Sequence, residues 1–190
     1  YDKARQVEGR SIPLNVKFMP ARIEKPDMYI LAVGVSEYKD VNIRLGSPAK
    51  DAIDLGSALK KVSSSLYRSV NVTTLTDSRA SRKGIQSALS DISTKARKID
   101  AVILFFAGHG DMENGSYYFI PWDTDISNLQ GSAMNIDVLS DFLKTVPAGK
   151  VALLLDTCKS GGAAKNLSMI AMARGYEDRK ILARLAKDRG

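Results

Sequence analysis

Apolar and polar residues alternate along this chain in a pattern that predicts strands separated by helices. Continuous apolar runs are typical of strands buried on both faces, and they cover residues 28–35, 101–107 and 151–155. Residues 71–76 are rich in β-branched side chains and predict a further strand. Helical spacing of apolar residues predicts helices over 48–62, from the N-cap Ser81 to Ala96, over 137–146, and in the tail from about Glu177.

This order of strands and helices predicts an α/β fold, a three-layer α/β/α sandwich around a mostly parallel sheet. Residues 116–123 predict a short extended excursion that ends near Pro121. We expect one domain over residues 27–190, because a chain of 190 residues can bury one large core. Residues 1–26 contain three prolines and no sustained periodicity, so they are expected to form a linker or an arm from a preceding domain.

Composition and charge narrow the class of protein without pointing to one function. Hydrophobic residues make up 44% of the chain and charged residues 26%, as in an ordinary globular protein. No apolar run is long enough for a membrane helix, and the net charge of +7 is spread among interleaved acidic residues. We therefore expect neither a nucleic-acid partner nor a membrane. A single cysteine rules out an internal disulfide and favours a reducing, cytoplasmic location.

Two of the apolar strands end in residues that can carry chemistry. Residues 101–107 lead into a Gly-His-Gly triplet centred on His109, and residues 151–155 lead into an Asp-Thr-Cys triplet that ends at Cys158. These are the only histidine and the only cysteine in the chain. Catalytic residues gather at the carboxyl ends of parallel strands, so both side chains are expected to face one cleft if the two strands are neighbours.

A cysteine beside a histidine is sufficient for nucleophilic catalysis. The thiolate attacks a carbonyl carbon, and the imidazole lowers the thiol pKa or gives a proton to the leaving amine. Gly108 and Gly110 have no Cβ, which is expected to let a substrate backbone approach closely. The backbone N–H groups of Gly110 and Cys158 are candidates for an oxyanion hole.

Each of these residues, taken alone, has a simpler explanation. A lone cysteine is usually a small apolar filler, and a lone histidine in a glycine-rich turn is usually a polar loop residue. Here the two stand at corresponding ends of buried strands, with His109 placed 49 residues before Cys158. That combination favours the catalytic interpretation.

The segments FFAGHGD and LLLDTCKSGG resemble the histidine and cysteine motifs of the caspase-like cysteine peptidases, the group of caspases, metacaspases and paracaspases. The resemblance extends from about Met28 through Cys158 and includes the first strand and helix. It implies a cysteine endopeptidase with His109 and Cys158 as the catalytic pair. The Asp-Thr-Cys triplet is similar to that of metacaspases, in which histidine usually follows the cysteine. Lys159 stands there instead, and a cation beside the thiol favours its thiolate.

The metacaspase and paracaspase branch prefers Arg or Lys before the scissile bond, and the resemblance implies the same preference here. It places one carboxylate of the specificity pocket at Asp156 and a second at Asp51, near the start of the first helix. Two close carboxylates can hold a guanidinium or an ammonium and repel acidic side chains. The simpler explanations are a helix-dipole residue for Asp51 and a turn cap for Asp156.

These motifs require no metal or cofactor. Four acidic residues near or after His109 are expected to be solvated loop residues: Asp111, Glu113, Asp123 and Asp125. Some metacaspases are activated by calcium, but no calcium site maps onto this sequence residue by residue. Calcium activation therefore stays open.

Caspase-like folds continue for about two strands beyond the cysteine segment, whereas this sequence predicts none after Cys158. We expect the chain to be the large-subunit portion, with a small-subunit fragment completing the sheet. Several Lys and Arg residues follow Cys158, so self-cleavage by a basic-specific peptidase is a hypothesis. Two alternatives stay open: a catalytically inactive scaffold that binds partners, and a nucleotide-binding α/β domain, although the turn after the first strand lacks a G-x-G-x-x-G motif.

Overall fold

The computed structural model describes residues 24–159 and 166–173 of the chain. Its strands are β1 (Met28–Gly34), β2 (Val70–Thr76), β3 (Ala101–Glu113), β4 (Ser116–Phe119), β5 (Met134–Asn135), β6 (Lys150–Lys159) and β7 (Asn166–Ala173). Its α-helices are α1 (Pro48–Ser63), α2 (Arg82–Lys95), α3 (Leu129–Ser132) and α4 (Ile136–Thr145). Short 3-10 helices are η1 (Val41–Ile43), η2 (Asp77–Arg79) and η3 (Ile126–Asn128). None of the helices within these ranges is long and apolar enough to cross a membrane.

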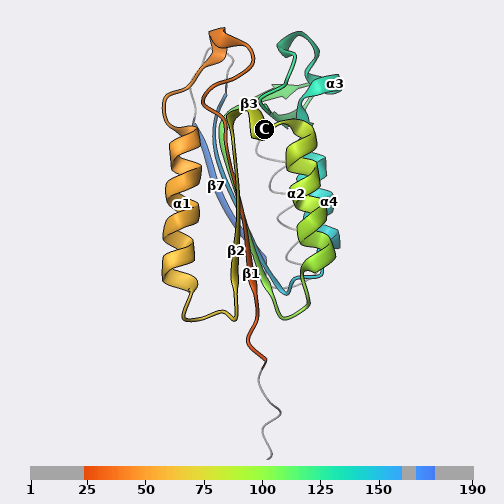
Figure 1. The fold of residues 1–190 in the computed structure, drawn as a ribbon. Helices are drawn as coiled ribbons and strands as arrows, with labels where there is room; N and C mark the ends of the chain where they lie inside the picture. The colour runs from red at the N-terminus through yellow and green to blue at the C-terminus, as the bar shows by residue number, and fades with distance from the viewer. Residues whose placement is uncertain (1–23, 160–165, 174–190) are drawn as a thin grey trace, which may run out of the picture.

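The strands form one sheet whose central members run parallel. β3 pairs with β1 on one side and with β6 on the other, and β2 is the edge strand beyond β1. β7 pairs antiparallel with β6, while β4 and β5 extend the sheet from the far end of β3. Figure 1 shows α1 on one face of the sheet and α2 with α4 on the other, which confirms the predicted three-layer α/β/α architecture.

The helices begin where local chemistry favours a helix start. Ser81 caps α2, because its side chain accepts a hydrogen bond from the backbone N–H of Gly84 at 3.1 Å. Pro48 occupies the first position of α1, where its missing N–H costs no hydrogen bond. Asn135 caps α4 by accepting from the backbone N–H of Asp137 at 2.8 Å. The predicted helices over 48–62, 82–96 and 137–146 are therefore confirmed to within one residue.

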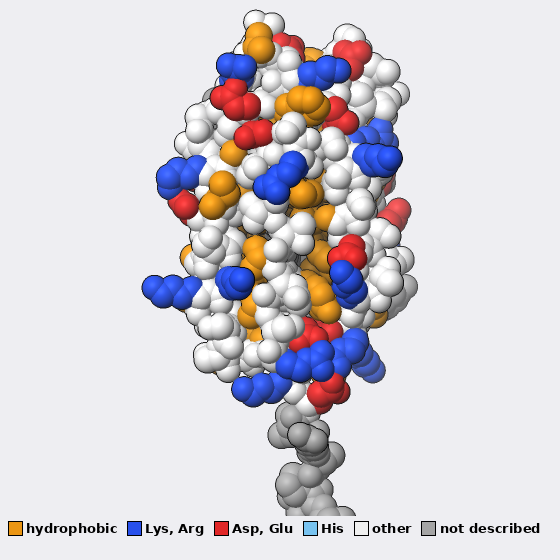
Figure 2. Space-filling view, in the orientation of Figure 1, with side chains coloured by type: hydrophobic (Ala, Val, Ile, Leu, Met, Phe, Trp, Pro, Cys, Tyr) orange, Lys and Arg blue, Asp and Glu red, His pale blue; other side chains and the backbone are white. Residues whose placement is uncertain are grey.

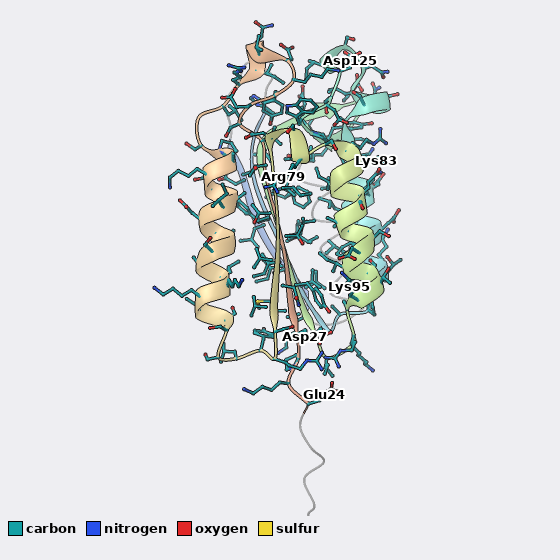
Figure 3. All side chains as sticks on the ribbon, in the orientation of Figure 1. Glu24, Asp27, Arg79, Lys83, Lys95 and Asp125 are labelled. Carbon is teal, nitrogen blue, oxygen red and sulfur yellow. The ribbon has the colours of Figure 1, made fainter. Side chains whose placement is uncertain are left out.

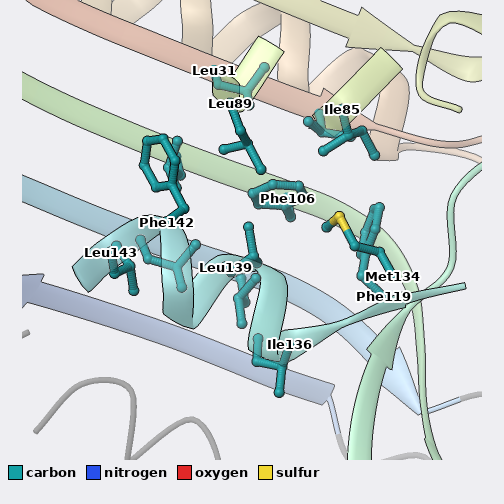
Figure 4. Packing of buried hydrophobic residues seen from close by; sticks show 14 of the residues in the cluster. Leu31, Ile85, Leu89, Phe106, Phe119, Met134, Ile136, Leu139, Phe142 and Leu143 are labelled. Carbon is teal, nitrogen blue, oxygen red and sulfur yellow. The ribbon is translucent and has the colours of Figure 1, made fainter. Parts of the chain in front are cut away.

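The larger core lies between the sheet and the helices α2 and α4. Phe106 of β3 and Phe119 of β4 meet edge to face, with ring centroids 5.2 Å apart. Figure 4 shows apolar side chains of both helices packing around these rings, among them Ile85, Leu89 and Leu139. Aromatic rings of this size dominate the energetics of burial, so this layer contributes most of the hydrophobic stabilisation.

The other face of the sheet packs against α1 through a smaller cluster that combines alanines with Phe105 and Leu55. Ala32, Ala52 and Ala107 are buried in one cluster there. A Cβ added to Gly34 at the end of β1 would lie 2.0 Å from the carbonyl oxygen of Pro48. The start of α1 therefore lies directly on the carboxyl end of β1, and only glycine permits that approach.

The strands that carry His109 and Cys158 are longer than the sequence predicted. β3 continues through His109 to Glu113 and then turns back into β4. The turn residues Asn114 and Gly115 both have positive φ, the combination that a two-residue hairpin requires. The two candidate residues thus lie within strand extensions and not in loops just beyond them, because pairing with β4 and β6 extends β3 beyond its apolar run.

The expectation that the strands after Cys158 are missing needs one correction. β7 runs antiparallel to β6, with Asp156 opposite Ser168 and Cys158 opposite Asn166. Its sequence, NLSMIAMA, is rich in Met and Ala, which favour helices over strands, so its apolar pattern did not predict a strand. The tail from Glu177, predicted to be helical, lies outside the described residues.

At the end of the sheet opposite to His109, charged residues join the segments that precede β1, β2 and β3. Asp27, just before β1, accepts hydrogen bonds from Arg68 Nε and from Ser69 Oγ. Asp100, just before β3, is fully buried and accepts from the backbone N–H of Asp27 at 2.8 Å and from Arg97 Nη2 at 3.0 Å. Figure 3 shows Asp27 at this base of the sheet, near Glu24, which also pairs with Arg68 and Arg97.

The edge of β2 is open along its length among the described residues. Figure 2 views the molecule onto this edge, between α1 and α2, and shows hydrophobic side chains along it and charges of both signs around it. A groove of about 650 Å³ follows the edge and is lined by residues such as Tyr29, Asn71 and Lys95. It extends toward the base of the sheet and contains neither His109 nor Asp156.

Candidate active site

His109 lies near the carboxyl end of the sheet, on the strand that has partners on both sides. In β3 it is half-buried, and it lies two residues after Ala107, the last residue of β3 that pairs with β1. Its Cα partner on the other side is Cys158 of β6. Neighbouring strands are about 4.8 Å apart, so the backbones of the two candidate residues are as close as a parallel sheet allows.

The imidazole of His109 is held through one ring nitrogen. Nε2 lies 2.9 Å from the backbone carbonyl oxygen of Ile43, at the end of η1. A carbonyl oxygen only accepts hydrogen bonds, so Nε2 carries the proton and Nδ1 carries the lone pair of the neutral ring. Nδ1 is buried and has no hydrogen-bond partner among the described residues. The ring therefore presents its basic nitrogen without a competing donor from this part of the chain.

Tyr38 holds the backbone of the same residue. Its hydroxyl accepts a hydrogen bond from the His109 N–H at 2.8 Å, and its ring lies 5.2 Å from the imidazole, centroid to centroid. Burial raises the pKa of Tyr38 far above its usual range, against the opposing effect of that hydrogen bond. The hydroxyl therefore stays protonated at any physiological pH.

A side-chain hydrogen bond links β6 to β4 at Thr157, one residue before Cys158. Thr157 is buried, and its hydroxyl lies 2.5 Å from the hydroxyl of Tyr117 in β4. β4 pairs with the end of β3 that also carries His109. The two strand ends are therefore linked by backbone pairing and by a buried side-chain hydrogen bond.

The glycines beside His109 serve a purpose different from the one predicted. A Cβ on Gly108 would lie 2.7 Å from the Tyr38 hydroxyl, and a Cβ on Gly110 would lie 2.1 Å from the Tyr117 hydroxyl. The space beside both glycines is thus filled by tyrosine side chains, so the idea that it admits a substrate backbone is wrong. Gly108 also has a φ of 149°, which non-glycine residues rarely adopt.

Asp156 lies on the α1 side of the sheet. Side chains alternate along a strand, and Leu154, two residues earlier, packs against the cluster beneath α1. The Asp156 side chain is exposed. Its Cα partner in β3 is Ala107, and the partner of Ala107 in β1 is Gly34. Asp156 is thus two strands away from the point where α1 meets the sheet.

Asp51 lies in the first turn of α1, half-buried, with its N–H bonded to the Ser47 carbonyl at 3.0 Å. The next residue, Ala52, packs toward Gly34. Asp51 and Asp156 therefore lie at the same end of the sheet and on the same face. The strand beneath the start of α1, β1, is two strand spacings, or about 10 Å, from β6, which carries Asp156. Their shared role in a specificity pocket stays a prediction.

The other acidic residues have local roles. Asp123 and Asp125 are exposed: Asp123 accepts from the backbone N–H of Arg82, and Asp125 caps η3. Hydrogen bonds from the Ser127 hydroxyl and N–H lower the pKa of Asp125. Asp111 and Glu113 lie in β3 and are half-buried, so they are strand residues and not loop residues. No group of three or more potential ligands that could hold a metal ion occurs in the described ranges.

Two residues that contact His109, Ile43 and Tyr38, could not be recognised from the sequence pattern. The Ile43 contact comes from a backbone carbonyl, which any residue can supply, so only the fold reveals it. Tyr38 stands in a polar loop, VSEYKD, where a tyrosine is unremarkable without knowledge of its partner. Lys159, the residue that departs from the metacaspase pattern, is the Cα partner of Gly110.

A three-layer α/β sandwich with a histidine and a cysteine on adjacent parallel strands is the arrangement of a class of cysteine peptidases. The sequence model of the caspase domain (Peptidase C14) matches residues 28–186, and the chain belongs to this family of cysteine peptidases. No curated protein matches the chain.

Among solved structures, the chain is similar to protein GSU0716 from Geobacter sulfurreducens, with a TM-score of 0.57 and 22% sequence identity. The match covers 72% of this chain and 52% of that one, so the chain spans about half the length of this structural relative. At this level of identity the similarity supports the fold alone.

Proposed function

We propose that this protein is a cysteine endopeptidase in which Cys158 and His109 hydrolyse peptide bonds after Arg or Lys. The observation that carries the proposal is the register of β3 and β6, which makes His109 and Cys158 direct neighbours. The orientation of the imidazole supports it further, since Ile43 engages Nε2 and leaves Nδ1 as the basic nitrogen.

The proposed reaction uses the side chains of His109 and Cys158 and one water molecule. His109 takes the thiol proton, and the Cys158 sulfur attacks the carbonyl carbon of the scissile bond. The tetrahedral intermediate collapses as the imidazolium gives its proton to the leaving amine, which leaves an acyl-enzyme thioester. Water, deprotonated by the imidazole, then attacks the thioester; the C–S bond breaks, the acid product leaves, and the imidazolium returns the proton to the Cys158 sulfur. The backbone N–H groups of Gly110 and Cys158 stay the proposed oxyanion hole; the two residues stand in paired strands, one register position apart.

Asp156 and Asp51 are the proposed carboxylates of the specificity pocket. Both lie on the α1 side at the carboxyl end of the sheet, and β6 carries Asp156 two residues before the proposed nucleophile. A pair of carboxylates in this position would hold the Arg or Lys side chain while its carbonyl lies at Cys158. The thiolate chemistry also suits the reducing, cytoplasmic location expected from the sequence.

The test is hydrolysis of reporter peptides that end in Arg, Lys or Asp, with and without added calcium, by the complete protein. We expect cleavage after Arg and Lys, complete loss of it in Cys158→Ala, and a loss of at least about 100-fold in His109→Ala. Asp156→Asn and Asp51→Asn should each raise KM for the Arg reporter, because each removes one charge from the pocket. Cleavage after Asp alone would contradict the pocket assignment.

The alternative is a catalytically inactive scaffold that binds partners through the caspase-like fold. Lys159, where metacaspases usually have histidine, is the feature that favours it. The test uses the complete protein together with any small-subunit fragment that completes the sheet. If this protein shows no Cys158-dependent cleavage of any reporter, the scaffold interpretation is favoured.

A further inference from the structure

One loop supplies the hydrogen-bond partners of the His109 N–H and of the His109 ring. Residues 36–45 connect β1 to the approach of α1, and they contain Tyr38, which binds the His109 N–H, and Ile43, which binds its Nε2. The backbone of the histidine and the imidazole ring are thus held from the same direction. Any shift of this loop changes both contacts together.

Tyr38 is buried in the core, although it belongs to a loop. It is 3% exposed and belongs to the main core between the sheet and α2. Its hydroxyl occupies the space where a Cβ of Gly108 would lie, and its ring lies against the imidazole at an interplanar angle of 37°. The Tyr38 side chain thus contacts the His109 backbone and the His109 ring and fills the space beside Gly108.

The loop itself is anchored from η2. Oδ1 of Asp77 accepts hydrogen bonds from the backbone N–H groups of Ser36 and Glu37, each at 2.9 Å, directly before Tyr38. Asp77 has a φ of 47°, a conformation that non-glycine residues rarely adopt. The Leu45 N–H closes the loop on the carbonyl of Ser36 at 2.9 Å. Asp77 therefore fixes the loop directly before Tyr38, the residue that contacts His109.

We propose that Tyr38 is a positioning residue, which acts through the backbone of His109 and keeps the imidazole in a single orientation and tautomer. Without the hydroxyl, the half-buried His109 N–H loses this acceptor. The end of β3 can then shift so that the N–H reaches another acceptor. The ring then leaves the Ile43 carbonyl for part of the time, and Nδ1 is no longer held as the basic nitrogen. The catalytic consequence rests on the proposed function, whereas the effect on the imidazole does not.

Tyr38→Phe is the sharpest variant, because it removes one oxygen atom and keeps the ring against the imidazole. His109 is the only histidine in these 190 residues, so nitrogen-15 NMR of this chain, labelled in its histidine, reports on this ring alone. In alkaline solution, where the ring is neutral, the wild-type imidazole should give two widely separated nitrogen signals, one for the protonated nitrogen and one for the nitrogen with the lone pair. In Tyr38→Phe the two signals should move toward each other as the tautomers exchange.

The kinetic expectation is a fall in kcat of roughly 10- to 100-fold with little change in KM, because orientation of the base is lost and substrate binding is not. Ile92→Val is the matched control: it trims a buried residue of α2 that is 3% exposed and far along the sheet from His109. It lowers stability without touching the loop. The control should keep both the separated nitrogen signals and the wild-type kcat.

Separated nitrogen signals and an unchanged kcat in a folded Tyr38→Phe protein would overturn the proposal. A change of equal size in Ile92→Val would also overturn it, because the effect would then follow stability. If Tyr38→Phe does not fold, Asp77→Asn tests the same loop, since asparagine keeps the acceptor oxygen and tolerates a positive φ but loses the charge. It should move the nitrogen signals in the same direction by a smaller amount, and a wild-type spectrum would count against the proposal.

The two proposals fail in different ways. If the wild-type protein cleaves no reporter peptide, the peptidase assignment fails, and the nitrogen spectra still decide whether Tyr38 positions the ring. If the wild-type protein is active and His109→Ala is not, while Tyr38→Phe matches the wild type in both measurements, only the positioning role fails.

Discussion

Single residues at this site are constrained by packing within the protein as much as by contact with a substrate. Gly108 is the clearest case, because its lack of a side chain makes room for the hydroxyl that binds the His109 N–H. Ile43 contributes through its carbonyl oxygen, so its side chain can vary without loss of the contact. The identity of Gly108 is therefore restricted by geometry, whereas that of Ile43 is restricted only by the path of the loop.

Gly108→Ala should lower the free energy of unfolding by about 1–3 kcal/mol, the cost of a disfavoured backbone conformation, and should also reduce kcat. The added methyl group would meet the Tyr38 hydroxyl at 2.7 Å, at a φ of 149° that alanine avoids. Urea unfolding and reporter hydrolysis measure the two effects. Gly46→Ala is the control, because a Cβ there meets nothing within 4 Å. Equal losses in the two variants would contradict the geometric explanation.

At the scale of elements, the sequence predicted the helices and the apolar parts of the strands, because their periodicity is set by burial. It did not predict where β3 and β6 end, since these extensions depend on pairing with β4 and with each other and not on apolar side chains. The proximity of His109 and Cys158 could be predicted because parallel strands share one carboxyl edge. The loop that holds the imidazole could not, because a backbone carbonyl leaves no pattern in the sequence.

The charged base of the sheet links several elements at once and makes their docking dependent on pH. The hydrogen bond from Arg68, with smaller contributions from Ser69 and Arg97, lowers the pKa of Asp27. Burial alone would raise the pKa of Asp100, but hydrogen bonds from Arg97 and from the Asp27 N–H outweigh it, so this pKa is also lowered. Both carboxylates therefore bind protons less readily in the folded protein than in the unfolded chain.

It follows that the free energy of unfolding should fall on acidification. Because both folded pKa values lie below the unfolded value of about 3.9, the stabilisation is present above that pH and is lost as the pH drops through the folded values. Urea unfolding between about pH 6 and pH 2.5 measures this. Asp100→Asn should cost about 1–3 kcal/mol at neutral pH and flatten the acid dependence. Asp91→Asn, which removes an exposed pair with Lys95, should change neither, and an equally flat curve for it would refute the assignment.

On the scale of the whole molecule, the proposed chemistry gathers at one end of the sheet for a topological reason. β3 brings His109, β6 brings both Asp156 and Cys158, and α1 brings Asp51 because it starts where β1 ends. The opposite end holds the ion pairs that stabilise the sheet. The ion pairs and the proposed site therefore lie at opposite ends of the sheet, so a variant among the ion pairs is expected to leave the geometry of the site largely unaffected.

Self-cleavage is the prediction that involves the chain as a whole. The segment after Cys158 contains basic residues that match the proposed specificity, among them Lys165, Arg174 and Arg179. Incubation of the complete protein should therefore yield fragments that end in Lys or Arg, detected by intact-mass spectrometry. Cys158→Ala should stay whole, because the nucleophile acts on its own chain.

The concentration dependence then separates two routes to such fragments. Cleavage within one molecule is first order, so its half-time should not change when the protein is diluted tenfold, whereas cleavage between molecules should slow in proportion. Adding active protein to Cys158→Ala tests the second route directly. Because cleavage after Lys165, Arg174 or Arg179 leaves His109 and Cys158 together on the N-terminal fragment, activity should persist after processing. A fully active protein whose mass remains that of the uncut chain would show that processing is not part of its mechanism.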